Sequence, residues 1–260
     1  MREAEIVCWE ALDPVSAEMQ QARHLYESTL DEAERIPWLW IEKAVTSRAT
    51  WRPGRWSPHL LLSARRRRSR LPGPVAGFAY GMHLPGYGGY ACYLGVEPRF
   101  RGQGIGSRLM SLLVRVLQVD AACEGVHLPF VVVESHEPDA PESTKDSALW
   151  QARLRLFRRV GARHLSGLTF RAPNFMRRSA GPVPLQLFLI PVDKPAETFD
   201  GAALRGVAAG LLQHVYGRSE RDPLYRETLP PDCRPALEVL APSRNGAIAL
   251  ERHPQSSGSP

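Results

Sequence analysis

Apolar residues recur along the chain in alternating strand-like and helix-like periods. Short apolar runs predict strands over residues 4–12, 57–67, 74–84, 89–98, 127–135, 163–172 and 183–192. A spacing of three to four residues between apolar positions predicts helices over residues 16–35, 36–45, 104–120, 147–162 and 198–216. This order predicts a mixed α/β (α+β) fold, with a central mixed sheet of six to seven strands and helices on both faces.

The character of the sequence changes after Pro191. Residues 198–216 carry a separate amphipathic pattern, and the segment that follows is short and interrupted by prolines. We therefore expect a main domain over residues 1–193 and a C-terminal helical extension over residues 194–250. Residues 251–260 are polar and rich in serine and proline, which predicts a disordered tail.

The composition excludes several classes of protein. Of the 260 residues, 43% are hydrophobic and 23% are charged, which is typical of a globular chain and not of a disordered one. No apolar run reaches the roughly 18 residues of a membrane span, and the first twenty residues lack a signal-peptide pattern. The four cysteines lie far apart along the chain. We therefore expect a cytoplasmic protein without a structural zinc site or any other bound metal.

The formal net charge is +6, and arginine carries almost all of the positive charge. A basic surface favours polyanionic partners, but nucleotides, nucleic acids and membranes all meet that description. Charge alone therefore does not select a function.

The segment over residues 94–107 carries the most chemical information. A predicted strand runs into a loop that contains Gly102, Gly104 and Gly106, and this loop opens the helix predicted over residues 104–120. Glycines let the backbone approach an anion closely, and the free N–H groups of a first helical turn point toward it. Arg101 adds a positive charge that can bind phosphate oxygens. The residues predict a phosphate or pyrophosphate site here.

Two familiar phosphate loops do not fit this segment. A Walker loop requires a lysine followed by serine or threonine, and the segment has no lysine. The dinucleotide-binding fingerprint requires glycine or alanine where this chain has Ser107. That fingerprint also requires an acidic residue about 20 positions further on, whereas Glu134 comes roughly thirty residues later.

The loop resembles the acetyl-CoA loop of the GNAT superfamily of N-acetyltransferases. That loop reads R/Q-x-x-G-x-G/A after a strand that ends L-x-V-x-P, and this chain reads Arg101-x-x-Gly104-x-Gly106 after Leu94-x-Val96-x-Pro98. The order of elements over residues 4–192 and the helix end LRLFRRVGA are also similar to the superfamily. The resemblance implies the GNAT fold, acetyl-CoA as cosubstrate, and transfer of its acetyl group to a primary amine of a small-molecule acceptor.

The resemblance also implies which residues bind the cosubstrate. The pantetheine arm would lie between the strands at residues 89–96 and 127–134. Backbone groups of Leu94, Gly95 and Val96 would then pair with its amides and polarise the thioester carbonyl. The pyrophosphate would be held by Arg101 and by the N–H groups of Gly102, Gln103, Gly104, Ile105, Gly106 and Ser107. The alternative is that the glycines only form a tight turn between strand and helix.

The catalytic residues follow the superfamily less closely. Many members use a tyrosine as the acid that protonates the departing thiolate, but the matching residue here is Phe157, which cannot donate a proton. Tyr93 is the nearest substitute in the sequence, and ordinary packing is its alternative explanation. Glu134 ends the apolar strand that would face the thioester, so it is our candidate for the base that accepts the amine proton, unless it is simply solvated.

Two other functions remain open at this stage. The phenylalanine at position 157 is compatible with a catalytically weak acyl-CoA-binding or regulatory module, and the helix over residues 198–216 could form a partner surface or a homodimer. The arginine stretch over residues 65–70 could bind nucleic acid phosphates or the 3′-phosphate of CoA. Its position in a hairpin turn favours a solvated tip, so we do not expect a nucleic acid or membrane partner.

Overall fold

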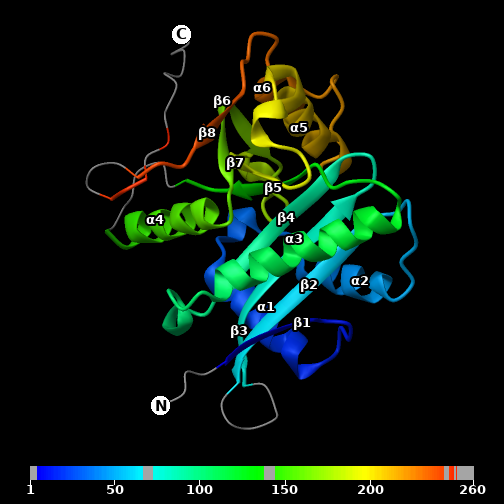
Figure 1. Cartoon of the computed structure of the whole chain (residues 1–260), viewed down its shortest axis with the longest axis vertical. Coiled ribbons are helices and arrows are strands. Elements are labelled where there is room, and N and C mark those ends of the chain that lie inside the picture. The colour runs from blue at the N-terminus through cyan, green and yellow to red at the C-terminus, as the bar shows by residue number, and fades with distance from the viewer. Residues whose placement is uncertain (1–4, 67–72, 138–143, 243–245, 249, 251–260) are drawn as a thin grey trace. The chain divides into compact units, whose positions relative to one another are not determined.

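The computed structural model describes residues 5–66, 73–137, 144–242, 246–248 and 250 (Figure 1). It contains two compact units. The first comprises residues 1–132 and 174–181, and the second comprises residues 133–173 and 182–260. The predicted disordered tail and most of the arginine stretch fall outside the described residues.

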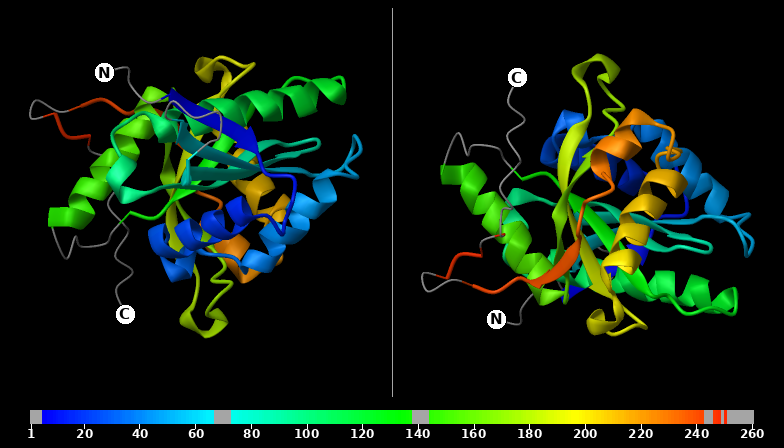
Figure 2. Two further views of the ribbon diagram at one scale, coloured as in Figure 1. Left: turned by 90° about the horizontal axis from the view of Figure 1, so that it is seen from below. Right: turned by 90° about the horizontal axis from the view of Figure 1, so that it is seen from above.

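The first unit contains an antiparallel array of four strands. They follow one another in sequence order: β1 (Glu5–Glu10), β2 (Ser57–Arg66), β3 (Val75–Leu84) and β4 (Gly88–Val96). Helices α1 (Ala17–Thr29) and α2 (Trp38–Arg48) lie on one face of these strands and α3 (Ile105–Cys123) lies on the other, as Figures 1 and 2 both show. Every residue of β3 is buried, because helices cover it on both sides.

A segment distant in sequence, residues 174–181, also belongs to the first unit. The ring of Phe175 packs edge-on against Trp40 of α2, with 5.3 Å between the centroids. The guanidinium group of Arg177 forms an ion pair with the carboxylate of Glu32. These contacts join the segment to α2 and to the 3-10 turn over Glu32–Glu34 that precedes it.

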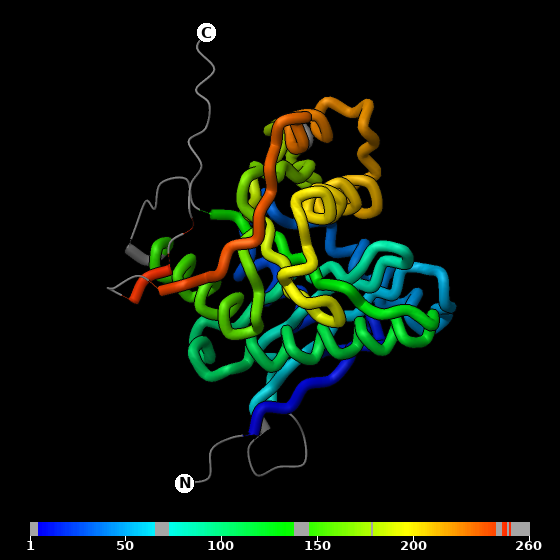
Figure 3. Tube along the Cα trace, turned by 45° about the horizontal axis from the view of Figure 1, so that its top comes forward, coloured from blue at the N-terminus to red at the C-terminus, as the bar shows by residue number. Residues whose placement is uncertain are grey.

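The second unit is built on β6 (Arg163–Ala172), which pairs antiparallel with β7 (Val183–Pro191) and with β8 (Ala236–Val239). Its helices are α4 (Thr144–Arg159), α5 (Gly201–His214) and α6 (Pro223–Thr228). Figure 3 follows the extension from α5, drawn in yellow, through α6 to β8 in orange and red. Strand β5 (Phe130–Ser135) belongs to both units, since the first unit includes its residues up to Val132 and the second begins at Val133.

The predicted elements are confirmed to within a few residues at most of their ends. The described residues contain eight strands instead of the six or seven expected, and the extra elements lie in the extension. The sequence pattern predicts neither α6 nor β8. Strand β8 has only four residues, so it is too short to show a period, and it exists because it pairs with β6.

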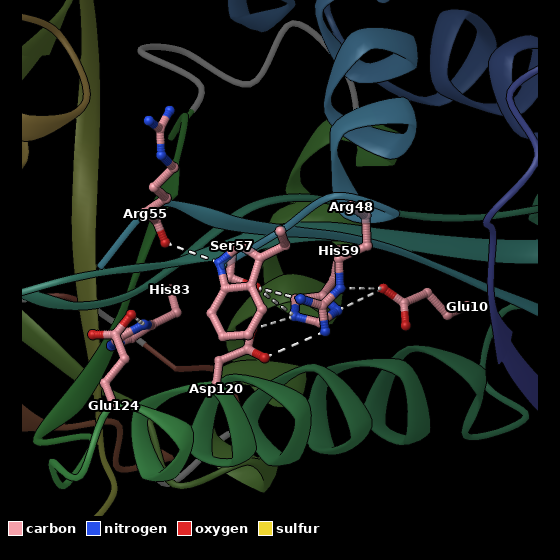
Figure 4. A network of polar contacts seen from close by, with 9 residues as sticks. Glu10, Arg48, Arg55, Ser57, His59, His83, Asp120 and Glu124 are labelled. Carbon is pink, nitrogen blue, oxygen red and sulfur yellow. Dashed lines mark hydrogen bonds and ion pairs between the residues drawn. The ribbon is translucent and has the colours of Figure 1, made fainter. Parts of the chain in front are cut away.

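A buried network of charged side chains joins four elements of the first unit (Figure 4). The two ring nitrogens of His59 on β2 lie 2.7 Å from Glu10 Oε1 on β1 and 2.6 Å from Asp120 Oδ2 on α3. Arg48 on α2 lies 3.3 Å from both carboxylates and donates a hydrogen bond to Ser57 at 2.8 Å. Two cations thus face two anions.

The geometry favours the imidazolium form of His59. A neutral ring has one N–H group, whereas both ring nitrogens here need a proton to donate to a carboxylate. Burial alone would lower the pKa of His59, but the hydrogen bonds and charges of Asp120 and Glu10 outweigh burial and raise it. Burial likewise opposes ionisation of Glu10 and Asp120, and the bonds and charges of His59 and Arg48 nevertheless lower both pKa values.

This network fixes one end of α3. Asp120 lies fifteen residues after Ile105, the first residue of the helix, which corresponds to about 22 Å along its axis. Apolar residues of α3, among them Leu109, Leu113 and Leu117, are fully buried between these two points. Charge pairing near the C-terminus and apolar packing along the helix therefore hold its N-terminus in place.

We expect Asp120→Asn to destabilise the protein by about 3–5 kcal/mol, because it removes one charge from a buried pair. Urea denaturation near pH 6 measures this loss. The matched control is Glu27→Gln, which breaks the exposed pair with Arg23 and should cost less than about 1 kcal/mol. Equal losses in the two variants would contradict the assigned importance of the network.

The raised pKa of His59 also predicts how stability depends on pH. His59 makes its full contribution to the free energy of unfolding below the ordinary histidine pKa of about 6.5. This contribution is lost as the pH rises through the higher pKa that His59 has in the folded protein. Burial lowers the pKa of His83, so that residue contributes in the opposite direction, almost entirely below about pH 7.5. The free energy of unfolding, measured by urea denaturation, should therefore fall as the pH rises above about 7.5, and it should fall less in Asp120→Asn.

Candidate functional site

The glycine loop joins β4 to α3 in a conformation that depends on glycine. After β4 the chain forms a single 3-10 turn over Pro98–Phe100, and α3 begins at Ile105. Gly102 and Gly104 have φ angles of 78° and 83°, a left-handed region that other residues rarely adopt. Among the described residues, no atom outside the immediate neighbours lies within 4 Å of an ideal Cβ built at either position. There is therefore free space next to the loop backbone, where the side chains of these two residues would lie if they were not glycine.

In the described part of the chain, no side chain caps the N-terminus of α3. Gly104 is its N-cap residue, and the first turn contains no acidic residue. By contrast, side chains of Ser16, Asp200 and Asp222 accept hydrogen bonds from the first turns of α1, α5 and α6. The N–H groups and the positive end of the α3 dipole are thus left to a ligand or to water.

Arginine side chains surround this helix start. Arg101 is exposed, and its Nε donates to the carbonyl oxygen of Val96 at 3.1 Å. Arg108, in the first turns of α3, donates to the carbonyl oxygen of Ile6 at 3.2 Å. Two further guanidinium groups lie against the ring of Phe100, with 5.6 Å and 4.8 Å to its centroid; they belong to Arg65 and Arg99. The local charge favours an anionic ligand.

The end of β4 is shaped by packing as well as by pairing. Leu94 and Val96 lie opposite Ala79 and Gly77 of β3. A Cβ at Gly95 would lie 2.3 Å from the ring of Phe78, so packing alone accounts for this glycine. The register also shifts by one residue at Cys92, which forms a bulge and bends the strand just before this segment.

Tyr93 lies in an aromatic cluster on the α1 side of β4. Its ring meets Tyr26 edge-on at 5.2 Å and stacks on Tyr80 at 6.4 Å, and its hydroxyl donates to the carbonyl oxygen of Glu34 at 3.0 Å. Burial in this cluster raises the pKa of Tyr26 to about 12. Packing therefore accounts for Tyr93, and a proton-donor role for it stays a prediction.

Glu134 and Phe157 belong to the second unit, so the structure describes them apart from the loop. Phe157 on α4 is buried, with its ring 4.5 Å from that of Phe188 on β7. Glu134 lies near the end of β5 and is half-buried. Its Oε2 accepts a hydrogen bond from the hydroxyl of Tyr216 at 2.6 Å.

No sequence pattern indicates Tyr216 as a functional residue. It follows α5 and lies 82 residues beyond Glu134, so no local spacing connects the two. The charged network around His59 could not be predicted from the sequence either, because Glu10, His59 and Asp120 come from three separate elements. Only pairing between distant elements brings such residues together.

A family comparison decides what kind of domain carries the loop. Residues 19–139, which include the loop and most of the first unit, match the model of the acetyltransferase (GNAT) family. These residues form a GNAT-family domain. The family generally transfers acetyl groups from acetyl-CoA, and the predicted resemblance is thereby confirmed.

Solved structures are similar to this chain in fold. A protein assigned to the GNAT family from Bacteroides thetaiotaomicron has a TM-score of 0.53 at 16% identity, covering 82% of this chain and 99% of that one. Two others match less well. The NatC complex bound to Gag peptide and CoA has a TM-score of 0.49 at 15% identity, over 72% of this chain and 99% of that one. Arabidopsis thaliana NAA60 with acetyl-CoA has a TM-score of 0.47 at 14% identity, over 73% and 99%.

No curated protein sequence matches the chain significantly. In the part of the chain that the structure describes, no helix is both long and apolar enough to cross a membrane. Over the same residues, no three His, Cys, Asp or Glu side chains are grouped so as to hold a metal ion.

We expect Gly104→Asp to weaken acetyl-CoA binding by more than ~100-fold, because a carboxylate would replace an anion at the uncapped helix start. Isothermal titration calorimetry with acetyl-CoA measures this change. Gly104→Asn has nearly the same shape without the charge, so it should lose less affinity.

Gly86→Asp provides the matched control for backbone strain. Gly86 lies in the turn between β3 and β4 with a φ angle of 72° and open space around an ideal Cβ. This variant should bind acetyl-CoA like the wild type. If Gly104→Asp also keeps full affinity, the loop is only a turn and the pyrophosphate binds elsewhere.

Proposed function

We propose that this GNAT-family protein is an N-acetyltransferase that transfers the acetyl group of acetyl-CoA to a primary amine of a small-molecule acceptor. The observation that carries the proposal is the uncapped start of α3, preceded by two left-handed glycines, within the family domain. Its N–H groups would bind the pyrophosphate, together with Arg101. The Leu94-x-Val96-x-Pro98 pattern supports placing the thioester beside the end of β4, next to backbone groups of Leu94, Gly95 and Val96.

The proposed reaction is a direct attack. The neutral amine nitrogen forms a bond to the thioester carbonyl carbon, and the carbon–sulfur bond then breaks to release the CoA thiolate. The amine loses one proton, for which Glu134 is the proposed acceptor, and the thiolate gains one. Backbone N–H groups near Val96 would stabilise the negative charge that develops on the carbonyl oxygen.

The proton that the thiolate gains needs a donor, for which the sequence offers Tyr93 in place of Phe157. Phe157 is buried against Phe188 and has no proton to give, and the hydroxyl of Tyr93 is bonded to the carbonyl oxygen of Glu34. A water molecule can supply the proton instead. The same observation favours a second candidate function, a catalytically weak acyl-CoA-binding or regulatory module.

The homodimer expected through the helix over residues 198–216 gains no support from the apolar side chains of α5. Leu204, Val207 and Leu211 are buried, and α5 lies against β6 and β8 of its own unit. A homodimer therefore stays a prediction.

Calorimetric titration with acetyl-CoA and with CoA tests the proposed cosubstrate, and thiol release across a panel of primary amines tests the reaction. We expect saturable binding of both ligands and turnover with at least one amine. Binding without turnover would favour the second candidate function. Well-folded protein that binds neither ligand at millimolar concentration would rule out both functions.

Substitution of Glu134 tests the proposed base. Glu134→Gln removes the proton acceptor, so turnover should fall by ~100-fold at neutral pH while acetyl-CoA affinity is kept. Raising the pH should restore part of the rate, because more of the amine is then already neutral. Glu137→Gln, three residues further along, is the control and should retain its rate. Full turnover by Glu134→Gln at neutral pH would remove Glu134 from the mechanism.

A further inference from the structure

The hydrogen bond between Tyr216 and Glu134 joins the C-terminal extension to β5. The phenolic oxygen lies 2.6 Å from Glu134 Oε2, within the short range of an O–H group bonded to a carboxylate. Both residues are half-buried, so water screens the bond less than it would at the surface. The contact lies entirely within the second unit.

The position of Tyr216 is fixed by the end of α5. The N–H group of Val215 donates to the carbonyl oxygen of Leu211 at 3.0 Å, and that of Arg218 donates to Leu212 at 2.9 Å. Gly217, with a φ angle of 62°, supplies the left-handed residue that this helix ending requires. The turn that carries the tyrosine is therefore closed by backbone bonds on both sides.

The ring of Tyr216 is held as well. It packs against Phe170 of β6, with 6.1 Å between the centroids, and Phe170 is fully buried. The buried face of α5, which includes Val207 and Leu211, anchors the helix. A phenol fixed in this way presents its hydroxyl group in one direction, and Glu134 lies there.

We propose that Tyr216 is a positioning residue for Glu134, supplied by the C-terminal extension to the acyl-transfer reaction. The inference rests on the proposed function, in which Glu134 accepts the proton of the acceptor amine. A carboxylate at a strand end can rotate, and a hydrogen bond to Oε2 fixes which oxygen is available to the amine. The bond also stabilises the charged form of Glu134, which is the form that accepts a proton.

Other charged and titratable groups lie near this part of β5. Arg153 of α4 donates to the carbonyl oxygen of His136 at 3.1 Å, and Gln186 of β7 donates to Glu137 at 3.1 Å. His164 of β6 contacts Gln186 at 2.9 Å. Tyr216→Phe changes none of these groups, so a change in pH dependence would come from the lost hydroxyl group.

The first test compares Tyr216→Phe with Tyr225→Phe. Both keep an aromatic ring in the extension, but within the described part of the chain no hydrogen bond engages the hydroxyl group of Tyr225, which lies on α6. Tyr216→Phe should lower kcat by ~10-fold with little change in the KM for acetyl-CoA, and the acidic limb of kcat/KM should move to higher pH by ~1 pH unit. Tyr225→Phe should match the wild type.

A purely structural tether predicts a different outcome. In that case Tyr216→Phe would lower the melting temperature but leave the pH profile unchanged, and the proposal would be overturned. A double variant sharpens the comparison. If Tyr216 acts through Glu134, adding Tyr216→Phe to Glu134→Gln should not reduce kcat further, whereas an additional ~10-fold loss would show that it acts independently.

A second readout does not require turnover. Carbon-13 NMR of glutamate-labelled protein follows the titration of the Glu134 carboxyl group, which is identified by its absence in Glu134→Gln. Its titration midpoint should move to higher pH in Tyr216→Phe and stay unchanged in Tyr225→Phe. An unchanged midpoint in Tyr216→Phe overturns the proposal even if no amine is ever acetylated, so this failure is distinct from failure of the proposed function.

Discussion

The pairing of His59 with two carboxylates is the constraint on which the first unit depends. Each ring nitrogen donates to an oxygen less than 3 Å away, and Arg48 completes the balance of two cations and two anions. Buried charges are costly unless they are paired in this way. Because the four charged residues come from β1, β2, α2 and α3, the network holds these elements in one register.

The consequence for function lies at the opposite end of α3. The helix is fixed by Asp120 near its C-terminus and by apolar packing along its length, so its N-terminus needs no side-chain cap to stay in place. Gly104 takes the N-cap position at which α1, α5 and α6 have capping side chains. The charge pair that stabilises α3 and the loop proposed to bind the ligand thus lie toward opposite ends of a single helix.

The C-terminal extension contributes both to stability and to the surroundings of Glu134. Its helix α5 packs against β6 and β8 of its own unit, and its strand β8 pairs with Arg163–Ser166 of β6; both contacts contribute to stability. It also brings the hydroxyl group of Tyr216 to Glu134. The extension thereby supplies a hydroxyl group that bonds to Glu134 of β5. Phe157 of α4 has no such group, because its side chain is a buried phenylalanine ring.

The sequence by itself determined the order of elements and the glycine loop, because periodicity, turn residues and helix starts are encoded within a few neighbouring positions. Gly102 and Gly104 could be assigned from residue type alone, since few other residues adopt their backbone conformation. Only the tertiary structure decided that His59 joins Glu10 to Asp120 and that Tyr216 reaches Glu134. These contacts span tens of residues, and their partners are chosen by strand pairing and helix packing, which no local pattern records.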